Sequence, residues 1–273
     1  MEVFAARTVL APAHVGVLAS LGIERVLVYP RPVVGVLSTG NELTTGPAPL
    51  RRGQIRDSNR PALLARLRAD GFGTLDLGTG PDDEDALTAI IEDGAATCDA
   101  IVVSGGVSVG DRDLVKIVLW RLSGGAMRSM QLAVKPGRPF AFATLGTVPV
   151  FGLPGNPVAA LVSYELLVRP AICDMAGLEH LDRPRLEAVA EADFPRRKDG
   201  KLHIVGVVAR AGADAVVRAV PAGEQGSHRL SAMAAANALA IVPDGDGIRC
   251  GDVVDVLLLD PDGLYPLYRV DRW

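Results

Sequence analysis

The sequence predicts an α/β fold, namely a doubly wound and mostly parallel sheet, followed by a small all-β barrel domain. Short apolar, β-branched runs recur between residues 33 and 153, and stretches with apolar residues at helical spacing separate them. Beyond about residue 182 the chain changes to short β-rich runs between glycine, proline and aspartate turns. We therefore expect three regions, 1–31, 32–180 and 181–273, the first too short to bury a core of its own.

The first region should contain a helix and a short strand. Residues 12–22 form an apolar stretch that ends at Gly22, a residue type common where helices end. Residues 23–29 are apolar and β-branched, which predicts a strand.

The second region should alternate strands with helices. An aspartate, Asp82 or Asp83, can cap one helix, with further acids in its first turn as the helix dipole favours. Asn156 and Pro157 suit the cap and first turn of another. Strands are predicted over 33–38, 74–78, 100–104, 140–143 and 148–153, and helices over 59–69, 82–94, 113–122 and 157–175.

The third region should be a barrel or sandwich of short strands. One short helix is expected near residues 231–236. The predicted strands cover 186–192, 201–209, 215–219, 238–242 and 253–259.

Composition excludes several classes of protein. A net charge of −4 gives no electrostatic basis for nucleic-acid binding. No apolar run is long enough for a membrane span, and the N-terminus lacks the pattern of a signal peptide. The three cysteines and four histidines have no metal-ligand spacing, and the odd cysteine count fits a reducing cytoplasm.

Ligands of open parallel sheets bind outside the carboxyl ends of the strands, and polar stretches follow four of the predicted strands. One is a glycine-rich loop, Ser104-Gly105-Gly106-Val107-Ser108-Val109-Gly110. Adjacent glycines let the backbone approach an anion with its amides, and the following helix N-terminus favours a phosphate. The alternative is a tight turn without a ligand.

Three acids, Glu42, Asp82 and Asp113, each follow a different strand. They can therefore converge on one cleft, where carboxylates suit Mg²⁺ together with substrate phosphates. The alternative roles are helix caps for Asp82 and Asp113 and a solvated loop position for Glu42.

Two rigid segments complete the candidate site. Lys135-Pro136-Gly137 offers a compact cation on a restricted backbone. Pro154-Gly155-Asn156-Pro157 fixes a strand-to-helix turn. Each could also be a purely structural turn.

Taken in order, these motifs resemble one family, molybdopterin molybdenumtransferase, whose relatives include the E domain of gephyrin and plant molybdenum-insertion proteins. The resemblance spans about residues 10–260 and rests on Ser38–Leu43, Asp57-Ser58-Asn59, Ser104–Gly110, Lys135–Pro139, Gly152–Pro157 and Gly226-Ser227-His228.

The resemblance implies a molybdopterin-binding sheet domain and a C-terminal barrel. It implies a reaction in which molybdate enters adenylylated molybdopterin and AMP is released, with Mg²⁺. Glu42, Asp82 and Asp113 match positions that hold the metal and act in catalysis, and Lys135 and Ser227 match the molybdate side. The remaining binding positions implied are Thr39, Gly40, Asp57, Asn59, Ser104, Gly105, Gly106, Val107, Ser108, Gly110, Pro136, Gly137, Pro154, Gly155, Asn156 and Pro157.

The sequence departs from the family pattern at the oxyanion side. Gln131 stands where relatives often carry a lysine, Ala159 stands where they often carry a serine, and no expected basic residue is evident over 203–206. Two alternatives to the transferase stay open, a non-catalytic binding or scaffold module and the related molybdopterin adenylyltransferase.

The resemblance begins inside the family's first domain, so 1–31 is expected to be the remnant of that domain in a fragment or a shortened relative. Such a chain alone could bind without turnover. It is also expected to form a homodimer, as its mean hydropathy of +0.26 favours. Its expected partners include other proteins of molybdenum cofactor synthesis. Neither nucleic acid nor a membrane is expected as a partner.

Overall fold

A computed structural model describes residues 2–107, 113–223, 230–260 and 263–264. It confirms an α/β sheet domain followed by a closed β-barrel domain. The sheet holds six strands in the order β4 (Gly73–Gly80), β1 (Val33–Thr39), β5 (Ala100–Ser104), β9 (Val148–Leu153), β8 (Pro139–Leu145) and β6 (Arg128–Gln131). The first four are parallel, whereas β8 and β6 run antiparallel to their neighbours.

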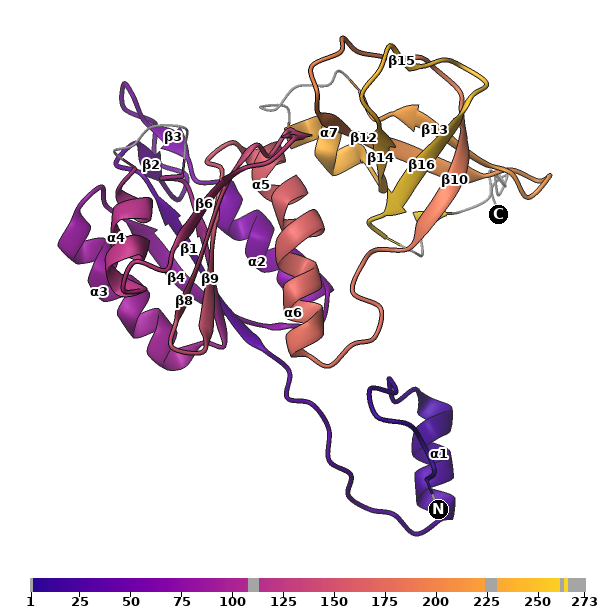
Figure 1. Cartoon of the computed structure of the whole chain (residues 1–273), viewed down its shortest axis with the longest axis horizontal. Helices are drawn as coiled ribbons and strands as arrows, with labels where there is room; N and C mark the ends of the chain where they lie inside the picture. The colour runs from indigo at the N-terminus through magenta and orange to yellow at the C-terminus, as the bar shows by residue number, and fades with distance from the viewer. Residues whose placement is uncertain (1, 108–112, 224–229, 261–262, 265–273) are drawn as a thin grey trace.

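Helices cover both faces of this sheet because its central strands are apolar on both sides (Figure 1). Val34 and Val36 of β1 pack toward one core cluster, and Leu37 packs toward the other. The first face carries α2 (Asn59–Ala69), α5 (Pro157–Ser163) and α6 (Arg169–Met175); the second carries α3 (Glu84–Thr97) and α4 (Leu114–Leu122).

The long helix predicted over 157–175 is present, but a π-helical turn, η1 (Tyr164–Val168), interrupts it between α5 and α6. Pro170 follows directly and has no amide hydrogen to give to the carbonyl four residues earlier. A widened turn at this place accommodates the proline ring, and the helix continues.

The barrel closes in a ring of five strands. They are, in order, β12 (Leu202–Ala211), β13 (Val217–Pro221), β10 (Arg185–Ala190), β16 (Val253–Leu258) and β14 (Ala238–Val242), which pairs again with β12. A sixth strand, β7 (Val134–Lys135), reaches from the sheet domain and pairs in parallel with the start of β12. The smaller elements are α7 (Leu230–Ala235), β11 (Phe194–Pro195) and β15 (Gly247–Ile248).

An apolar cluster joins barrel and sheet domain, built from Val162 of α5, Ile204 of β12, Leu239 of β14 and Leu259. An ion network lies beside it. Glu165 is 3% exposed and pairs with the guanidinium groups of Arg66 and Arg183, which belong to α2 and to the segment before β10. Arg66 also donates to the Leu259 carbonyl at 2.7 Å. The barrel is thus held against α2 and the helix that contains η1.

The first region contains α1 (Pro12–Ser20), as predicted, but the strand predicted over 23–29 is wrong. This stretch is exposed, Leu27 fully so, and no described strand pairs with it, so it lacks the ladder that a strand requires. It forms part of the connection between α1 and β1 (Figure 1). None of the described helices is both long and apolar enough to cross a membrane.

Candidate functional site

The carboxyl ends of β1, β5 and β9 open into a cleft of about 640 Å³. This volume lies within the usual range for sites that bind small molecules. Most residues singled out in the sequence line it: Thr39, Gly40, Glu42, Asp57, Asn59, Asp82, Ser104, Gly105, Gly106, Val107, Lys135, Pro136, Gly137, Pro154, Gly155, Asn156 and Pro157.

Asp113 is not part of the cleft lining, although it was expected beside Glu42 and Asp82. It lies at the start of α4, and its carboxylate is 3.2 Å from the ammonium of Lys116. Within the described ranges, no three acidic, histidine or cysteine side chains are grouped so as to hold a metal. The predicted three-carboxylate cluster is therefore reduced to Glu42 and Asp82. Ser108, Gly110 and Ser227 lie outside the described residues.

Asp82 ties the loop after β4 to the loop after β1. Its carboxylate accepts from the backbone amide of Asn41 at 3.1 Å, and its own backbone amide donates to the side-chain oxygen of Asn41 at 3.1 Å. The cap of α3 is instead Asp83, which accepts from the Ala86 amide at 2.9 Å. Asp82 is thus free of the capping role that was its alternative.

Glu42 folds back over Gly40 at the edge of the cleft. A Cβ atom on Gly40 would lie 2.6 Å from one carboxylate oxygen of Glu42, and Gly40 has a φ of +144°. Glycine at this position therefore lets the carboxylate lie directly against the backbone after β1.

Asp57, just before the start of α2, belongs to a network of ion pairs with Arg60 and Asp76. It accepts from the Ser38 hydroxyl at 3.0 Å and from Arg60, whose guanidinium also pairs with Asp76. Burial alone would raise the pKa of Asp76, but donation from the Gly78 amide and Arg60 outweighs it and the pKa is lowered. Arg60 neutralises Asp57, so this carboxylate acts as a structural acceptor more than as free charge.

Asn59 connects two loops of the cleft. Its amide group donates to the Ser104 hydroxyl at 2.7 Å and to the Gly155 carbonyl at 2.8 Å. Its side-chain oxygen is buried and has no protein partner among the described residues. A ligand in the cleft can therefore donate to it.

The glycine-rich loop is shaped by close contacts. Gly105 has φ +100°, and a Cβ there would lie 2.6 Å from the Thr39 carbonyl oxygen. Its amide donates to the Leu153 carbonyl at 3.1 Å and so faces away from a ligand, contrary to the expectation that both glycine amides point inward. In the part of the chain that is described, the Gly106 amide has no protein acceptor.

The opposite end of the cleft is basic. Lys135 on β7 and Arg138 line it, and neither pairs with a carboxylate of the described ranges. Gly137 has φ +108° and packs against the buried Ser163, which fixes the turn between β7 and β8. The cleft therefore presents carboxylates near β1 and β4 and two cations near β7 and β8, with a third cation, Arg56, on β3.

The turn into α5 has the structural role expected of it. Asn156 is the N-cap, with its side chain accepting from the Ala159 amide at 3.5 Å, and Pro157 is the first helical residue.

Several lining residues were not among the predicted site positions. Ile55 and Arg56 form β3, which pairs with β2 (Leu43–Thr44) beside the cleft. Two-residue strands leave no periodic signal, so only their position next to the Asp57-Ser58-Asn59 motif could have indicated them. The other lining residues lay inside the quoted motifs without being named as site positions, or, for Ala159, were noted as a departure from the family pattern; they are Ser38, Leu43, Ser58, Arg138, Pro139 and Ala159.

Comparison with protein families gives two matches. Residues 35–174 match the family described as "probable molybdopterin binding domain". Residues 187–259 match the C-terminal region, domain IV, of MoeA.

Among curated proteins, the chain is 35% identical over 249 residues to molybdopterin molybdenumtransferase of Haemophilus influenzae, covering 90% of this chain and 61% of the relative. It is 37% identical over 273 residues to the same enzyme of a Nostoc species, covering 94% of this chain and 60% of the relative. The chain thus spans about 60% of the length of these relatives. A solved structure of a molybdopterin biosynthesis MoeA protein from Pyrococcus horikoshii matches with a TM-score of 0.76 at 26% identity, over 94% of this chain and 62% of the other.

Proposed function

The chain belongs to the molybdopterin molybdenumtransferase family, and from this we propose that its cleft binds adenylylated molybdopterin and molybdate, inserts the metal into the pterin dithiolene and releases AMP. The observation that carries the proposal is the polarity of the cleft. The carboxylates Glu42 and Asp82 follow β1 and β4, the cations Lys135 and Arg138 lie on and after β7, and the glycine-rich loop follows β5, which lies between β1 and β9 in the sheet. A further cation of the lining, Arg56, lies on β3, whose Ile55 amide donates to the Glu42 carbonyl. This arrangement suits adenylylated molybdopterin. Its phosphate bridge would lie at the carboxylates, and its dithiolene, where molybdate reacts, would lie near Lys135 and Arg138.

At the acidic end, Glu42 and Asp82 provide two carboxylates, the number that Mg²⁺ commonly uses beside substrate phosphates. Bound there, Mg²⁺ would offset the charge of the phosphate bridge as the adenylate is released. The hydrogen bonds with Asn41 hold Asp82 at the edge of the cleft. Because residue 40 is glycine, the Glu42 carboxylate can lie directly against the backbone there. Asp113 is left out of this proposal because it faces Lys116.

In the middle of the cleft, the pterin phosphate would meet the Ser104 hydroxyl and the Gly106 amide. Asn59 orients the Ser104 hydroxyl by donating to it at 2.7 Å, and the hydroxyl itself donates to the Pro154 carbonyl at 3.5 Å. A phosphate oxygen in the cleft would have to replace that long hydrogen bond. The unsatisfied Asn59 oxygen would accept from a donor on the pterin.

At the basic end, Lys135 and Arg138 would hold molybdate. Ala159 places a methyl group in the lining where a hydroxyl is expected in relatives, and Gln131 does not line the cleft. These two positions favour, as a second candidate, a module that binds the pterin without turnover. The adenylyltransferase has no comparable support.

Measuring AMP release tests the proposal. The chain is mixed with adenylylated molybdopterin and Mg²⁺, with and without molybdate. We expect AMP release that depends on molybdate. Binding of the adenylate without molybdate-dependent AMP release would instead support the non-catalytic module, and absence of binding would reject both.

We extend the proposal to assembly and location. Exposed apolar side chains gather in the N-terminal segment, among them Val15, Leu27 and Val28, and this surface would be covered in a homodimer. All three cysteines are free, which suits a reducing, cytoplasmic location. We extend the same proposal to contacts with other proteins of molybdenum cofactor synthesis.

A further inference from the structure

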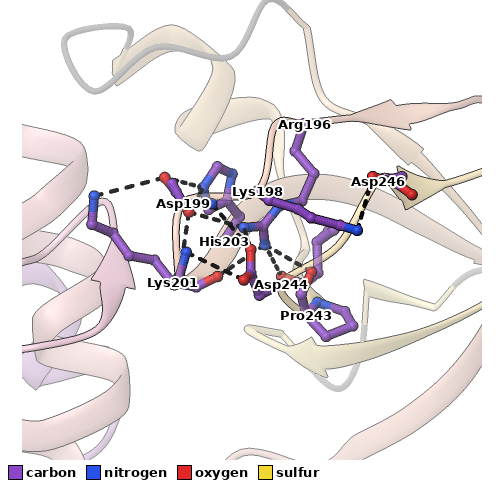
Figure 2. Close-up of polar contacts among 10 residues, drawn as sticks. Arg196, Lys198, Asp199, Lys201, His203, Pro243, Asp244 and Asp246 are labelled. Atoms are coloured by element: carbon purple, nitrogen blue, oxygen red, sulfur yellow. Dashed lines mark hydrogen bonds and ion pairs between the residues drawn. The ribbon is translucent and has the colours of Figure 1, made fainter.

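A cluster of charged side chains lies at the end of the barrel nearest β7, outside the cleft lining (Figure 2). The cluster consists of Arg196, Asp199, Lys201, His203 and Asp244, and we call it the barrel charge cluster.

Arg196 anchors the cluster. Its side chain is 1% exposed, and it donates to the carbonyl oxygens of Lys201, Val242 and Pro243 at 2.9, 3.1 and 2.7 Å. It also donates to the carboxylates of Asp199 and Asp244 at 2.9 and 2.5 Å. The loop before β12 is therefore held in one conformation, and with it the direction of the Asp199 carboxylate.

Asp199 in turn holds His203. The Nε2 atom of His203 lies 3.2 and 3.1 Å from the two oxygens of Asp199. The hydrogen bond with His203 is the largest cause of a lowered pKa for Asp199, so this carboxylate stays ionised. An ionised acceptor keeps a proton on Nε2, and the described residues offer no partner to the other ring nitrogen.

The strand register places His203 beside Lys135, although His203 itself is not part of the cleft lining. β7 and β12 pair in parallel, with Leu202 opposite Val134 and His203 opposite Lys135. Val134 and Leu202 both pack on the apolar cluster that joins the domains. Side chains alternate along a strand, so Lys135 and His203 both face the opposite side, on strands about 4.8 Å apart.

Lys135 lines the basic end of the cleft, so the charge of its ladder neighbour is felt there. The groups that face His203 are Asp199 and Lys201 on its own segment, Arg196 from the loop, Lys135 on β7 and Asp244 after β14. These groups comprise three cations and two carboxylates when His203 is neutral. Protonation of His203 adds a fourth cation.

We propose that His203, held by Asp199, is a positioning residue that adds a proton-dependent positive charge beside Lys135 and so sets the affinity of the cleft for a tetrahedral oxyanion. The inference rests on the proposed function, because it assigns a ligand class to the basic end of that cleft. It gives the chain a cation on the barrel side of the site, where residues 203–206 otherwise carry only Ile204, Val205 and Gly206.

Calorimetric titration with molybdate, and separately with sulfate, tests the proposal between about pH 5.5 and about pH 8, the range in which histidine changes charge. Sulfate keeps its two charges throughout, so a shared pH dependence belongs to the protein. We expect the unmodified chain to bind both oxyanions more tightly at the acidic end, on the order of threefold to tenfold. His203→Gln should bind at every pH as weakly as the unmodified chain does at pH 8.

The decisive variant is His203→Lys, which keeps a charge at every pH and can still pair with Asp199. It should bind tightly across the whole range. His180→Gln, at an exposed histidine outside the cleft lining, is the control and should keep the unmodified pH dependence.

A pH dependence that survives in His203→Gln, or a flat profile in the unmodified chain, would overturn the role of His203. Lys135→Gln separates this failure from failure of the proposed function, because it should weaken oxyanion binding at every pH if the cleft is correctly assigned. If the unmodified chain binds neither oxyanion, both assignments are wrong.

Discussion

At the scale of single residues, the proposed site depends most on Glu42 and Asp82 and on Asn59, which connects two loops of the cleft. Sequence position after a strand identified Glu42 and Asp82 as residues of the cleft. Asp113 also follows a strand, but it is not part of the cleft lining, and its carboxylate lies 3.2 Å from the ammonium of Lys116.

Asp82→Asn tests the metal role. Asparagine keeps an oxygen that can accept from the Asn41 amide, so the loop should hold its shape and the fold its stability. Loss of the charge should lower AMP release on the order of tenfold to a hundredfold, and raised Mg²⁺ should restore part of it. The measurement is AMP release against Mg²⁺ concentration. The control is Asp85→Asn, an exposed acid on α3; equal rates in both variants would remove Asp82 from the metal site.

Asn59→Ala tests the link between loops. It removes donation to the Ser104 hydroxyl, which is left in a part-buried setting, and to the Gly155 carbonyl, which is exposed. We expect a loss of unfolding free energy of about 1–3 kcal/mol together with weaker binding of adenylylated molybdopterin. Chemical unfolding and equilibrium binding would be measured on the same variant. Unchanged ligand affinity in a destabilised protein would make Asn59 purely structural.

At the scale of elements, most of the helices and strands could be predicted, because their apolar periodicity is local. The strand over residues 148–153 and the helix over 59–69 match in both bounds. The pairing of β7 with β12 could not be predicted, since it depends on contacts between distant segments. The π turn before Pro170 could not either, because the helical spacing of apolar residues does not reveal one widened turn. The pairing of β7 with β12 brings the barrel to the part of the cleft that contains Lys135.

The helix that contains η1 should depend on its buried ion network. Glu165→Gln removes one of the two carboxylates that Arg66 and Arg183 share, the other being Asp70. Because Asp70 still pairs with both guanidinium groups, the expected loss in the free energy of unfolding by urea is about 1.5–3 kcal/mol, the range for a hydrogen bond to a charged group. Glu187→Gln, on an exposed part of β10, should be nearly neutral. Similar small effects in both would show that the network contributes little.

At the scale of the whole molecule, the sheet domain supplies the cleft and the barrel supplies one side of its surroundings. The fold class was predictable because alternating strand and helix patterns give way to short strands near residue 182. Closure of the barrel through β12 and β13, and its docking by Ile204 and Leu239 on α5, were not, because register is a tertiary property.

The exposed apolar N-terminal segment leads to a prediction about assembly. Light scattering at micromolar concentration should give the mass of a dimer. Replacing Leu27 and Val28 by serine, both exposed here, should shift the mass toward a monomer with little change in thermal stability. A monomeric mass for the unmodified chain would contradict the proposal.

The polarity of the cleft is tested most directly by a crystal structure with adenylylated molybdopterin, Mg²⁺ and molybdate, using anomalous scattering from molybdenum to locate that atom. We expect the molybdenum signal beside Lys135 and the adenylate phosphate bridge beside Glu42 and Asp82, with the pterin phosphate at the Ser104 loop. A molybdenum signal elsewhere, or a ligand bound in the reverse direction, would contradict this expectation.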